Sequence, residues 1–159
     1  MQSSGSVTRP LRVGEPAPTF DASDGEGTRW STHGLAGRAF VLYFYPQDET
    51  PGCVAEACAF RDEHAAFAAL DVLVLGVSRD DDASHRAFAK NRRIPFPLLC
   101  DPTGAIHAAY GAVMLGGLPR RVSYLIGADL RVVAVFDSHL RPAAHAEKMM
   151  DAARALRAK

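Results

Sequence analysis

Two cysteines, Cys53 and Cys58, lie in the stretch "TPGCVAEACAFRD", where the sequence predicts the start of a helix. Thr50 is a favourable N-cap and Pro51 suits the first helical position, so Cys53 falls in the first turn. Gly52 allows another group to approach closely. Unpaired backbone N–H groups and the positive end of the helix dipole favour a thiolate at this place. The stretch therefore predicts a nucleophilic sulfur at the N-terminus of a helix.

The charged residues around Cys53 mostly oppose a thiolate. Asp48, Glu49 and Glu56 are anions, and nearby anions disfavour a second negative charge. The only cation in the stretch is Arg61, two turns further along the predicted helix. We therefore expect a cation from elsewhere in the chain to support the Cys53 thiolate.

The spacing of the two cysteines does not fit a disulfide inside a helix. Five residues correspond to about 7.5 Å of rise and about 140° of rotation, and hence to a Cα separation of roughly 8.6 Å. A disulfide needs a Cα separation of about 4.4–6.8 Å. If Cys53 and Cys58 bond, at least one turn must unwind. This arrangement suits a cycle in which one thiol reacts first and the other closes the disulfide later.

Other interpretations of the pair remain open on spacing alone. Both thiols could be buried, inert side chains on an alanine-rich helix. A zinc site that includes His64 is disfavoured because the stretch lacks the paired ligand spacing of common zinc sites. Thioredoxin-type chemistry is also disfavoured, because that motif is C-x-x-C and here four residues separate the cysteines.

Length and composition indicate one ordinary globular domain. The chain has 159 residues, with 48% hydrophobic and 23% charged residues, which is enough for a substantial core. Eighteen basic residues balance eighteen acidic ones, so no nucleic-acid interface is expected. No apolar run approaches a membrane span, and the start lacks the apolar core of a signal peptide. We expect residues 1–10 to be a disordered tail and 11–159 to form the single domain.

The elements that must position the cysteines can be predicted from hydrophobic patterns. An Asp-Gly turn signal predicts a hairpin at roughly 18–30, and "STHGLAG" suggests one helical turn. The predicted strands cover 39–45, 71–78, 96–100, 121–127 and 131–137. The predicted helices cover 51–70, 83–93, 104–111 and a last helix that Pro142 opens and that ends near 157. Alternating strands and helices with a hairpin near each end predict an α/β domain with a mixed sheet.

The stretch "YFYPQDETPGCVAEACAFRD" resembles the active-site signature of the peroxiredoxins, most closely the Q-type branch, also called bacterioferritin comigratory proteins. Pro46, Thr50 and Cys53 meet the family pattern P-x-x-x-T-x-x-C, and Cys58 matches the Q-type resolving cysteine. Further similarity covers most of the chain, in "VGEPAPTF", "GVSRDDDASHRAF", "PFPLLCDPTG", "AAYG" and "RVSYLI".

The resemblance implies a thioredoxin-like fold with an N-terminal extension, and it supplies the missing cation. In the family an arginine before the strand that contains "SYLI" supports the thiolate, and here this is Arg121. Strand alternation sends the adjacent Arg120 to the other face. Glu56 matches a family acid that orients this arginine. The resemblance thus implies catalytic roles for Cys53, Cys58, Thr50 and Arg121, and supporting roles for Pro46, Gly52 and Glu56.

The implied activity is a thioredoxin-dependent thiol peroxidase. Cys53 would attack a hydroperoxide and become a sulfenic acid, Cys58 would resolve it as an intramolecular disulfide, and thioredoxin or a similar dithiol would reduce the disulfide. The resemblance implies no cofactor and no metal, and together with the missing signal segment it implies a cytoplasmic location. The composition indicates no membrane or nucleic-acid partner. Because the resolving cysteine would lie in the same chain, we expect a monomer, with a weak dimer as the alternative. The alternatives are a redox sensor whose Cys53–Cys58 switch signals to a partner, and a holdase chaperone that forms a large assembly.

A few features depart from the family pattern or stand outside it. Gln47 stands where lysine is common, and Cys100 where serine is frequent, so we interpret Cys100 as a buried filler. We expect Met114 and Leu115 to pack, with a loop near the substrate entrance as the second interpretation. The six histidines form no paired ligand pattern, and we assign them to the surface or to packing. The acidic residues 80–82 are interpreted as a helix N-terminus rather than a metal loop.

Overall fold

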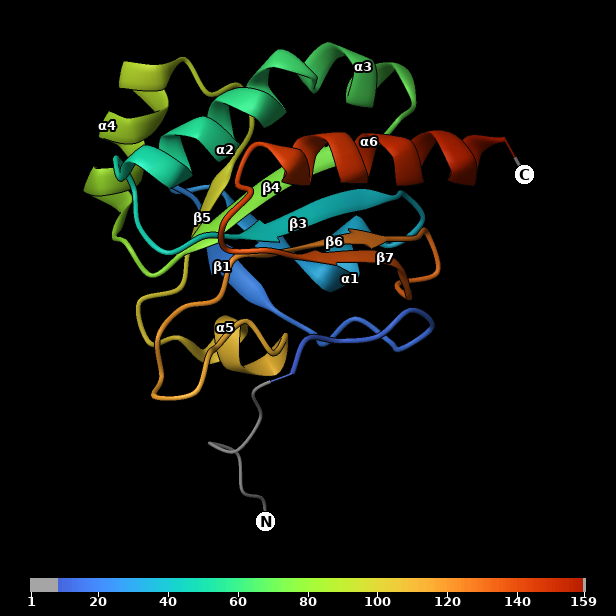
Figure 1. Ribbon diagram of the computed structural model, residues 1–159, viewed down its shortest axis with the longest axis horizontal. Helices are drawn as coiled ribbons and strands as arrows, with labels where there is room; N and C mark the ends of the chain where they lie inside the picture. Colours follow the sequence, from blue (N-terminus) through green and yellow to red (C-terminus); the bar gives the residue numbers. More distant parts are fainter. Residues whose placement is uncertain (1–8, 159) are drawn as a thin grey trace.

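A five-stranded mixed sheet forms the centre of the computed structural model, which describes residues 9–158 (Figure 1). Its strands are β3 (Phe40–Phe44), β4 (Leu73–Ser78), β5 (Leu98–Cys100), β6 (Val122–Ile126) and β7 (Val132–Asp137). They are arranged in the order β5-β4-β3-β6-β7. β3, β4 and β5 run parallel to one another, whereas β3–β6 and β6–β7 are antiparallel pairs. The mixed sheet and the antiparallel pair near the C-terminus confirm the sequence prediction.

The central strand β3 is apolar throughout because both faces of the sheet are covered. Val41 and Tyr43 pack in the core under the long helices, and Phe40, Leu42 and Phe44 pack in the core on the opposite face. The helices on the first face are α2 (Pro51–Asp62), α3 (His64–Ala69), α4 (Asp82–Arg92) and α6 (Ala144–Arg157). The other face carries β1 (Asp21–Ser23), β2 (Arg29–Ser31), α1 (Thr32–Leu35) and α5 (Ala105–Ala109).

The N-terminal hairpin lies where the Asp-Gly signal predicts it. β1 and β2 pair antiparallel, and the Asp24 carboxylate accepts hydrogen bonds from the backbone N–H groups of Glu26 and Thr28 in the turn. Most of the expected tail, residues 1–8, lies outside the described residues. Arg9 is described, and its guanidinium donates to Glu15 at 3.1 Å.

Two helix boundaries differ from the prediction. The single helix expected at 51–70 is divided at Glu63, whose backbone N–H faces the carbonyls of residues 59, 60 and 61. No proline or glycine marks this break, so the sequence pattern gave no signal for it. Pro142 does not occupy the first helical position. It precedes α6 by two residues, and Ala143 is the N-cap.

This arrangement brings three distant segments together at one end of the sheet. The loop after β3 leads into the first turn of α2, residue 121 lies just before β6, and the loop after β7 leads into α6. α6 packs against α2, β6 and β7. Within residues 9–158, no helix has the length and apolar character that crossing a membrane requires.

Candidate active site

The first turn of α2 carries the predicted nucleophile. Thr50 is the N-cap residue and Pro51 follows it at the start of the helix, as the sequence predicts. The Thr50 hydroxyl does not cap the helix; it donates to the Gln47 carbonyl at 2.9 Å. Its oxygen lone pairs therefore remain able to accept a hydrogen bond from a bound molecule. Pro46, half-buried, forms the bend between β3 and this loop.

Cys53 and Arg121 meet as the resemblance implies, although 67 residues separate them in the chain. The Cys53 thiol is 1% exposed, and Arg121 Nη1 lies 3.5 Å from Cys53 Sγ. Arg121 is itself 4% exposed, so water screens its charge poorly. A buried guanidinium that donates to sulfur favours the thiolate over the thiol. Arg120 points elsewhere and pairs with Asp137 at 2.9 Å, which confirms the expected alternation.

Glu56 holds the arginine from the next turn of α2. Its Oε1 accepts from Arg121 Nη1 at 2.6 Å, and the residue is fully buried. Burial raises the pKa of Glu56 to about 8, although the charge of Arg121 opposes the shift. Burial alone would lower the pKa of Arg121, but the Glu56 and Cys53 charges raise it. The arginine therefore stays charged, while its carboxyl partner is easily protonated.

Gly52 provides the space for Arg121. A Cβ atom at this position would lie 3.0 Å from Arg121 Nη2 and 3.8 Å from Pro142 Cγ. A contact of 3.0 Å is shorter than side-chain carbons normally tolerate. The expected close approach at Gly52 is therefore the approach of the guanidinium itself.

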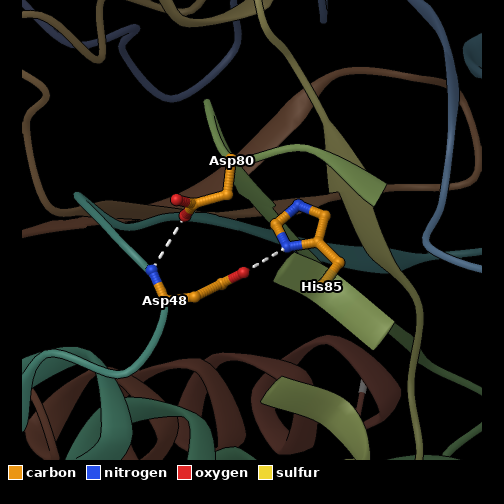
Figure 2. Close-up of side chains that lie close together, drawn as sticks. All are labelled: Asp48, Asp80 and His85. Atoms are coloured by element: carbon orange, nitrogen blue, oxygen red, sulfur yellow. Dashed lines mark hydrogen bonds and ion pairs between the residues drawn. The ribbon is translucent and has the colours of Figure 1, made fainter. Parts of the chain in front are cut away.

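The anion Asp48 is neutralised away from the thiol. Its Oδ2 lies 2.7 Å from His85 Nδ1, as Figure 2 shows. The same oxygen accepts from the Ser84 hydroxyl at 2.8 Å. Its Oδ1 accepts from the Tyr45 hydroxyl at 2.6 Å, and its backbone N–H donates to Asp80 at 2.8 Å. These contacts fix the loop before α2 to α4 and to the end of β4.

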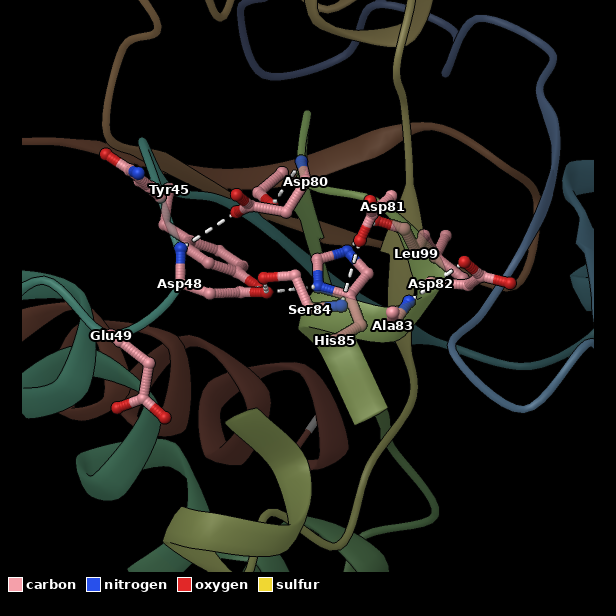
Figure 3. Close-up of polar contacts among 12 residues, drawn as sticks. Tyr45, Asp48, Glu49, Asp80, Asp81, Asp82, Ala83, Ser84, His85 and Leu99 are labelled. Carbon is pink, nitrogen blue, oxygen red and sulfur yellow. Dashed lines mark hydrogen bonds and ion pairs between the residues drawn. The ribbon is translucent and has the colours of Figure 1, made fainter. Parts of the chain in front are cut away.

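Glu49 has its own partners on the surface. Its carboxylate accepts from Arg92 at 2.9 Å and from Asn91 at 3.1 Å, and Figure 3 shows it apart from the buried cluster. Two of the three acids that seemed to oppose a thiolate, Asp48 and Glu49, therefore have donors on α4. No local sequence pattern indicates these pairs, because the partners lie more than 30 residues further along the chain.

Asp48, Asp80 and His85 place three ligand-type atoms within 4.8 Å of one another, which raises the question of a metal. His85 Nε2 lies 2.9 Å from the Leu99 carbonyl, and Nδ1 faces the Asp48 carboxylate. Both ring nitrogens face acceptors, so both carry protons. Burial lowers the pKa of His85, but the hydrogen bond and charge of Asp48 outweigh it and the net pKa is raised. An imidazolium has no lone pair for a metal, so this donor set does not fit one.

Cys58 lies one and a half turns beyond Cys53 on the same unbroken helix. It is half-buried, and all three cysteines are free thiols. The intact helix separates the pair in the way that the spacing predicts. A bond between them requires the helix to unwind.

Two residues of this site escaped the sequence analysis. His145, in the first turn of α6, is fully buried and lies with Nδ1 3.5 Å from Glu56 Oε2. Ser123, two residues after Arg121 on the same face of β6, is hydrogen-bonded to His145 Nδ1 at 2.8 Å. The histidines were expected either on the surface or in packing, and His145 is one that packs in the interior. The sequence feature that could have indicated this contact is the polar Ser123 within the buried strand "VSYLI".

Two further expectations need correction. Cys100 is half-buried rather than buried, and burial together with nearby aspartates raises its pKa to about 11. Leu115 does not pack: it is 86% exposed at the tip of the loop between α5 and β6. Asp81, by contrast, caps α4 through the Ser84 backbone N–H at 2.9 Å, so the acidic run is the helix N-terminus that the sequence predicts.

Comparison with known sequences places these features in a family. The AhpC/TSA family profile matches residues 13–135. The chloroplastic peroxiredoxin Q of Populus jackii is 37% identical over 142 residues, which cover 88% of this chain and 67% of the relative. The corresponding protein of Gentiana triflora is 37% identical over 147 residues, which cover 91% of this chain and 68% of the relative.

Solved structures agree with the sequence matches. Peroxidoxin BcpB from Mycobacterium tuberculosis superposes with a TM-score of 0.85 at 34% identity, over 92% of this chain and 98% of that chain. The bacterioferritin comigratory protein of Xanthomonas campestris superposes with a TM-score of 0.80 at 30% identity, over 87% of this chain and 92% of that one. The sheet, its helices and the N-terminal hairpin confirm the thioredoxin-like fold. The chain therefore belongs to the AhpC/TSA family, in its peroxiredoxin Q branch.

Proposed function

We propose that this peroxiredoxin reduces hydrogen peroxide and organic hydroperoxides through Cys53. The observation that carries the proposal is the buried contact between Arg121 Nη1 and Cys53 Sγ, 3.5 Å, at the N-terminus of α2. A charged donor beside a sulfur at a helix N-terminus favours the nucleophilic thiolate. The X. campestris neighbour was studied for alkyl peroxide reduction, which supports this substrate class.

The reaction begins with the Cys53 thiolate attacking the terminal oxygen of the hydroperoxide. The S–O bond forms, the O–O bond breaks, and the leaving oxygen departs as an alkoxide or hydroxide that takes a proton. Sulfur is oxidised to a sulfenic acid and the peroxide is reduced. Arg121 and the backbone N–H groups of the first turn stabilise the charge that moves onto the leaving oxygen. The free lone pairs of Thr50 Oγ1 orient the peroxide by accepting a hydrogen bond from its O–H group.

Cys58 then resolves the sulfenic acid. α2 unwinds, the Cys58 thiolate attacks Cys53 sulfur, and hydroxide leaves and takes a proton as the disulfide forms. Two electrons from a dithiol, which we propose is thioredoxin, restore both thiols. Because the attacking and resolving cysteines share one chain, the cycle needs no second subunit, and we propose a cytoplasmic monomer.

A coupled assay with thioredoxin, its reductase and NADPH tests this proposal. We expect the wild type to turn over hydrogen peroxide, Cys53→Ser to be inactive and Cys58→Ser to lose thioredoxin-driven turnover. Cys100→Ser is the matched control and should keep wild-type turnover. After one equivalent of peroxide, mass spectrometry should find a Cys53–Cys58 disulfide in the wild type.

Different outcomes reject different parts of the proposal. Turnover by Cys58→Ser at the wild-type rate would make Cys58 a structural residue. Stoichiometric oxidation of Cys53 without turnover would reject thioredoxin as reductant and favour a redox sensor. Failure of Cys53 to oxidise at all would reject the peroxidase mechanism. Sedimentation of a large assembly would reject the monomer and favour the holdase alternative.

A further inference from the structure

The loop between β7 and α6 is attached to two parts of the active site (Figure 1). At its start the Ser138 backbone N–H donates to the Arg121 carbonyl at 3.3 Å. Near its end Pro142 Cγ lies 3.8 Å from the place that a Cβ atom of Gly52 would occupy. The loop therefore contacts both the arginine that supports the Cys53 thiolate and the residue that precedes Cys53 in the chain.

Leu140 lies midway between these two attachments, and its side chain is 89% exposed. Two residues span at most about 7 Å, so the Leu140 Cα is no further than this from the Cα atoms of Ser138 and Pro142. A single exposed apolar side chain is common on protein surfaces and needs no function. The position of Leu140 beside the residues that hold the reactive sulfur is what indicates a role.

Further contacts hold this loop in place before any substrate arrives. The Ser138 carbonyl lies 2.8 Å from His145 Nε2, and the Arg141 guanidinium lies 6.0 Å from the centre of the Phe136 ring. A contact surface that is already fixed loses little conformational entropy when it binds a ligand. Leu140 is therefore presented from an anchored loop.

The depth of the sulfur decides which part of a hydroperoxide can reach the loop. Cys53 is 1% exposed and Arg121 is 4% exposed. Only the terminal O–OH group of an organic hydroperoxide has to reach the sulfur, so its organic group lies further out, against the residues around the entrance. Contact between an apolar organic group and an exposed leucine removes apolar surface from water, which is favourable. Hydrogen peroxide has no organic group and gains nothing from such a contact.

We propose that Leu140 is a specificity-determining residue that binds the apolar group of organic hydroperoxides. This inference rests on the proposed peroxidase function of Cys53 and deepens it. The contact is the same before and during the attack on the O–O bond, so it lowers the KM for an organic hydroperoxide without changing the chemistry at sulfur. The preference over hydrogen peroxide grows with the apolar area of the organic group.

The first test compares kcat/KM for hydrogen peroxide and cumene hydroperoxide in the coupled assay. We expect Leu140→Ser to lower kcat/KM for cumene hydroperoxide by about threefold to fivefold, because part of one leucine side chain is lost from the contact. The value for hydrogen peroxide should stay unchanged, and tert-butyl hydroperoxide should lose less than cumene hydroperoxide. Leu140→Met, an apolar side chain of similar volume, should keep most of the wild-type preference.

Two control variants change exposed residues elsewhere. His139→Ser alters the neighbouring exposed side chain in the same loop. Val13→Ser removes an apolar side chain that is 66% exposed. Val13 precedes Gly14, whose N–H donates to the carbonyl of Val132 at the start of β7, whereas Leu140 follows the end of that strand. Both controls should keep the wild-type ratio of the two kcat/KM values.

A second test measures binding without any peroxide chemistry. Cumyl alcohol, the product of cumene hydroperoxide reduction, is titrated into the reduced wild type and the amide resonances are followed by NMR. We expect the amides of residues 139–141 to shift with alcohol concentration, and we expect these shifts to be lost in Leu140→Ser. The amide of Val13 should not shift in either protein.

The outcomes separate this inference from the proposed function. An unchanged ratio in Leu140→Ser, an equal loss for both peroxides, or the same loss in Val13→Ser would overturn the inference. A higher KM for thioredoxin with an unchanged peroxide ratio would assign Leu140 to the reductant, and loss of a concentration-dependent dimer would assign it to a second copy. Either result overturns the inference. Absence of turnover with both peroxides rejects the proposed function, and the titration then decides whether the loop binds an apolar group.

Discussion

Two buried histidines flank the start of α2, and their surroundings give them opposite charge states. His85, from α4, faces the Asp48 carboxylate and the Leu99 carbonyl, so it is a cation with a raised pKa. His145, from α6, faces the Ser123 hydroxyl and the Ser138 carbonyl and lies near Arg121, so it is neutral with a pKa lowered to about 4. Burial is the same in both places. The partners decide the charge.

The two histidines accordingly serve different parts of the site. The Asp48–His85 ion pair, with Ser84 and Tyr45, fixes the loop that precedes Cys53 (Figure 3). The neutral His145 contacts the carboxyl group that holds Arg121. A charged side chain thus secures the backbone, and a neutral one lies against the carboxyl group that holds Arg121.

We expect the largest effect on stability when the ion pair of the charged histidine, His85, is broken. His85→Leu leaves the Asp48 carboxylate buried without its counter-ion, and loss of one partner of a buried ion pair costs about 3–5 kcal/mol. We expect the free energy of unfolding, measured by urea titration at pH 7, to fall by about this amount.

Two controls show whether the charge is responsible. Asp48→Leu/His85→Leu removes both charges and should cost less than the sum of the single variants. Glu49→Gln breaks the exposed pair with Arg92 in the same loop, and surface pairs contribute about 1 kcal/mol or less. Equal losses in His85→Leu and Glu49→Gln would contradict a buried ion pair at His85.

The pH dependence of stability should separate the two histidines. His145 has a folded pKa of about 4 against an ordinary value of 6.5, so between these values only the unfolded chain binds the proton. Stability should therefore fall by up to about 3 kcal/mol as the pH drops through this window. For His85 the folded pKa is the higher one, so its stabilisation is complete below 6.5 and is lost as the pH rises through the folded pKa.

This prediction is measured as urea unfolding at several pH values in a Glu56→Gln background. This background is needed because the contribution of Glu56 to stability changes with pH in the opposite direction to that of His145. Its folded pKa of about 8 exceeds the ordinary value of 4.5, so its contribution falls as the pH rises between the two. His145→Asn should flatten the acid limb, and His85→Asn the alkaline limb. Identical profiles for the two variants would show that the histidines do not differ in charge.

A smaller effect is expected at Gly52, which tests the position of Arg121 rather than its charge. A methyl group there would lie 3.0 Å from Nη2, so the guanidinium must shift. We expect Gly52→Ala to slow peroxide reduction about tenfold, because small misplacements of a charged donor are costly. Stability should rise or stay constant, since alanine is the better helix former by about 1 kcal/mol. Ala55→Gly on the exposed side of α2 is the control, with lower stability and unchanged rate.

The sequence alone predicted the parts of the molecule that depend on local pattern. The apolar run at 39–45 is a doubly covered strand, and the Thr-Pro-Gly-Cys motif opens a helix. The resemblance to the peroxiredoxins indicated Arg121 as the cation beside Cys53, and the alternation of side chains along the strand excluded Arg120. These inferences need only spacing, side-chain type and a family motif.

The contacts that tune the site could not be predicted in this way. The histidine partner of Asp48 lies 37 residues away on α4, and the histidine next to Glu56 lies on α6, so neither appears in any local pattern. Histidines have no characteristic spacing when their role is to contact a single carboxyl group. The break at Glu63 has no clear sequence signal either, because neither proline nor glycine stands in this segment.

The smallest effect is expected at Cys100. Here the comparison is between two thiols, Cys53 and Cys100, whose surroundings also differ in charge. Cys53 has the Arg121 guanidinium beside its sulfur, whereas burial and the nearby aspartates raise the pKa of Cys100 to about 11. We expect iodoacetamide at pH 7 to modify Cys53 before Cys100, because the thiolate is the reacting form. Cys100→Ser should change the free energy of unfolding by less than about 1 kcal/mol and leave turnover unchanged. Mass spectrometry of the alkylated peptides checks the order of reaction. Modification of Cys100 first would mean that its aspartate surroundings do not suppress the thiolate, and that Arg121 alone does not distinguish the two sulfurs.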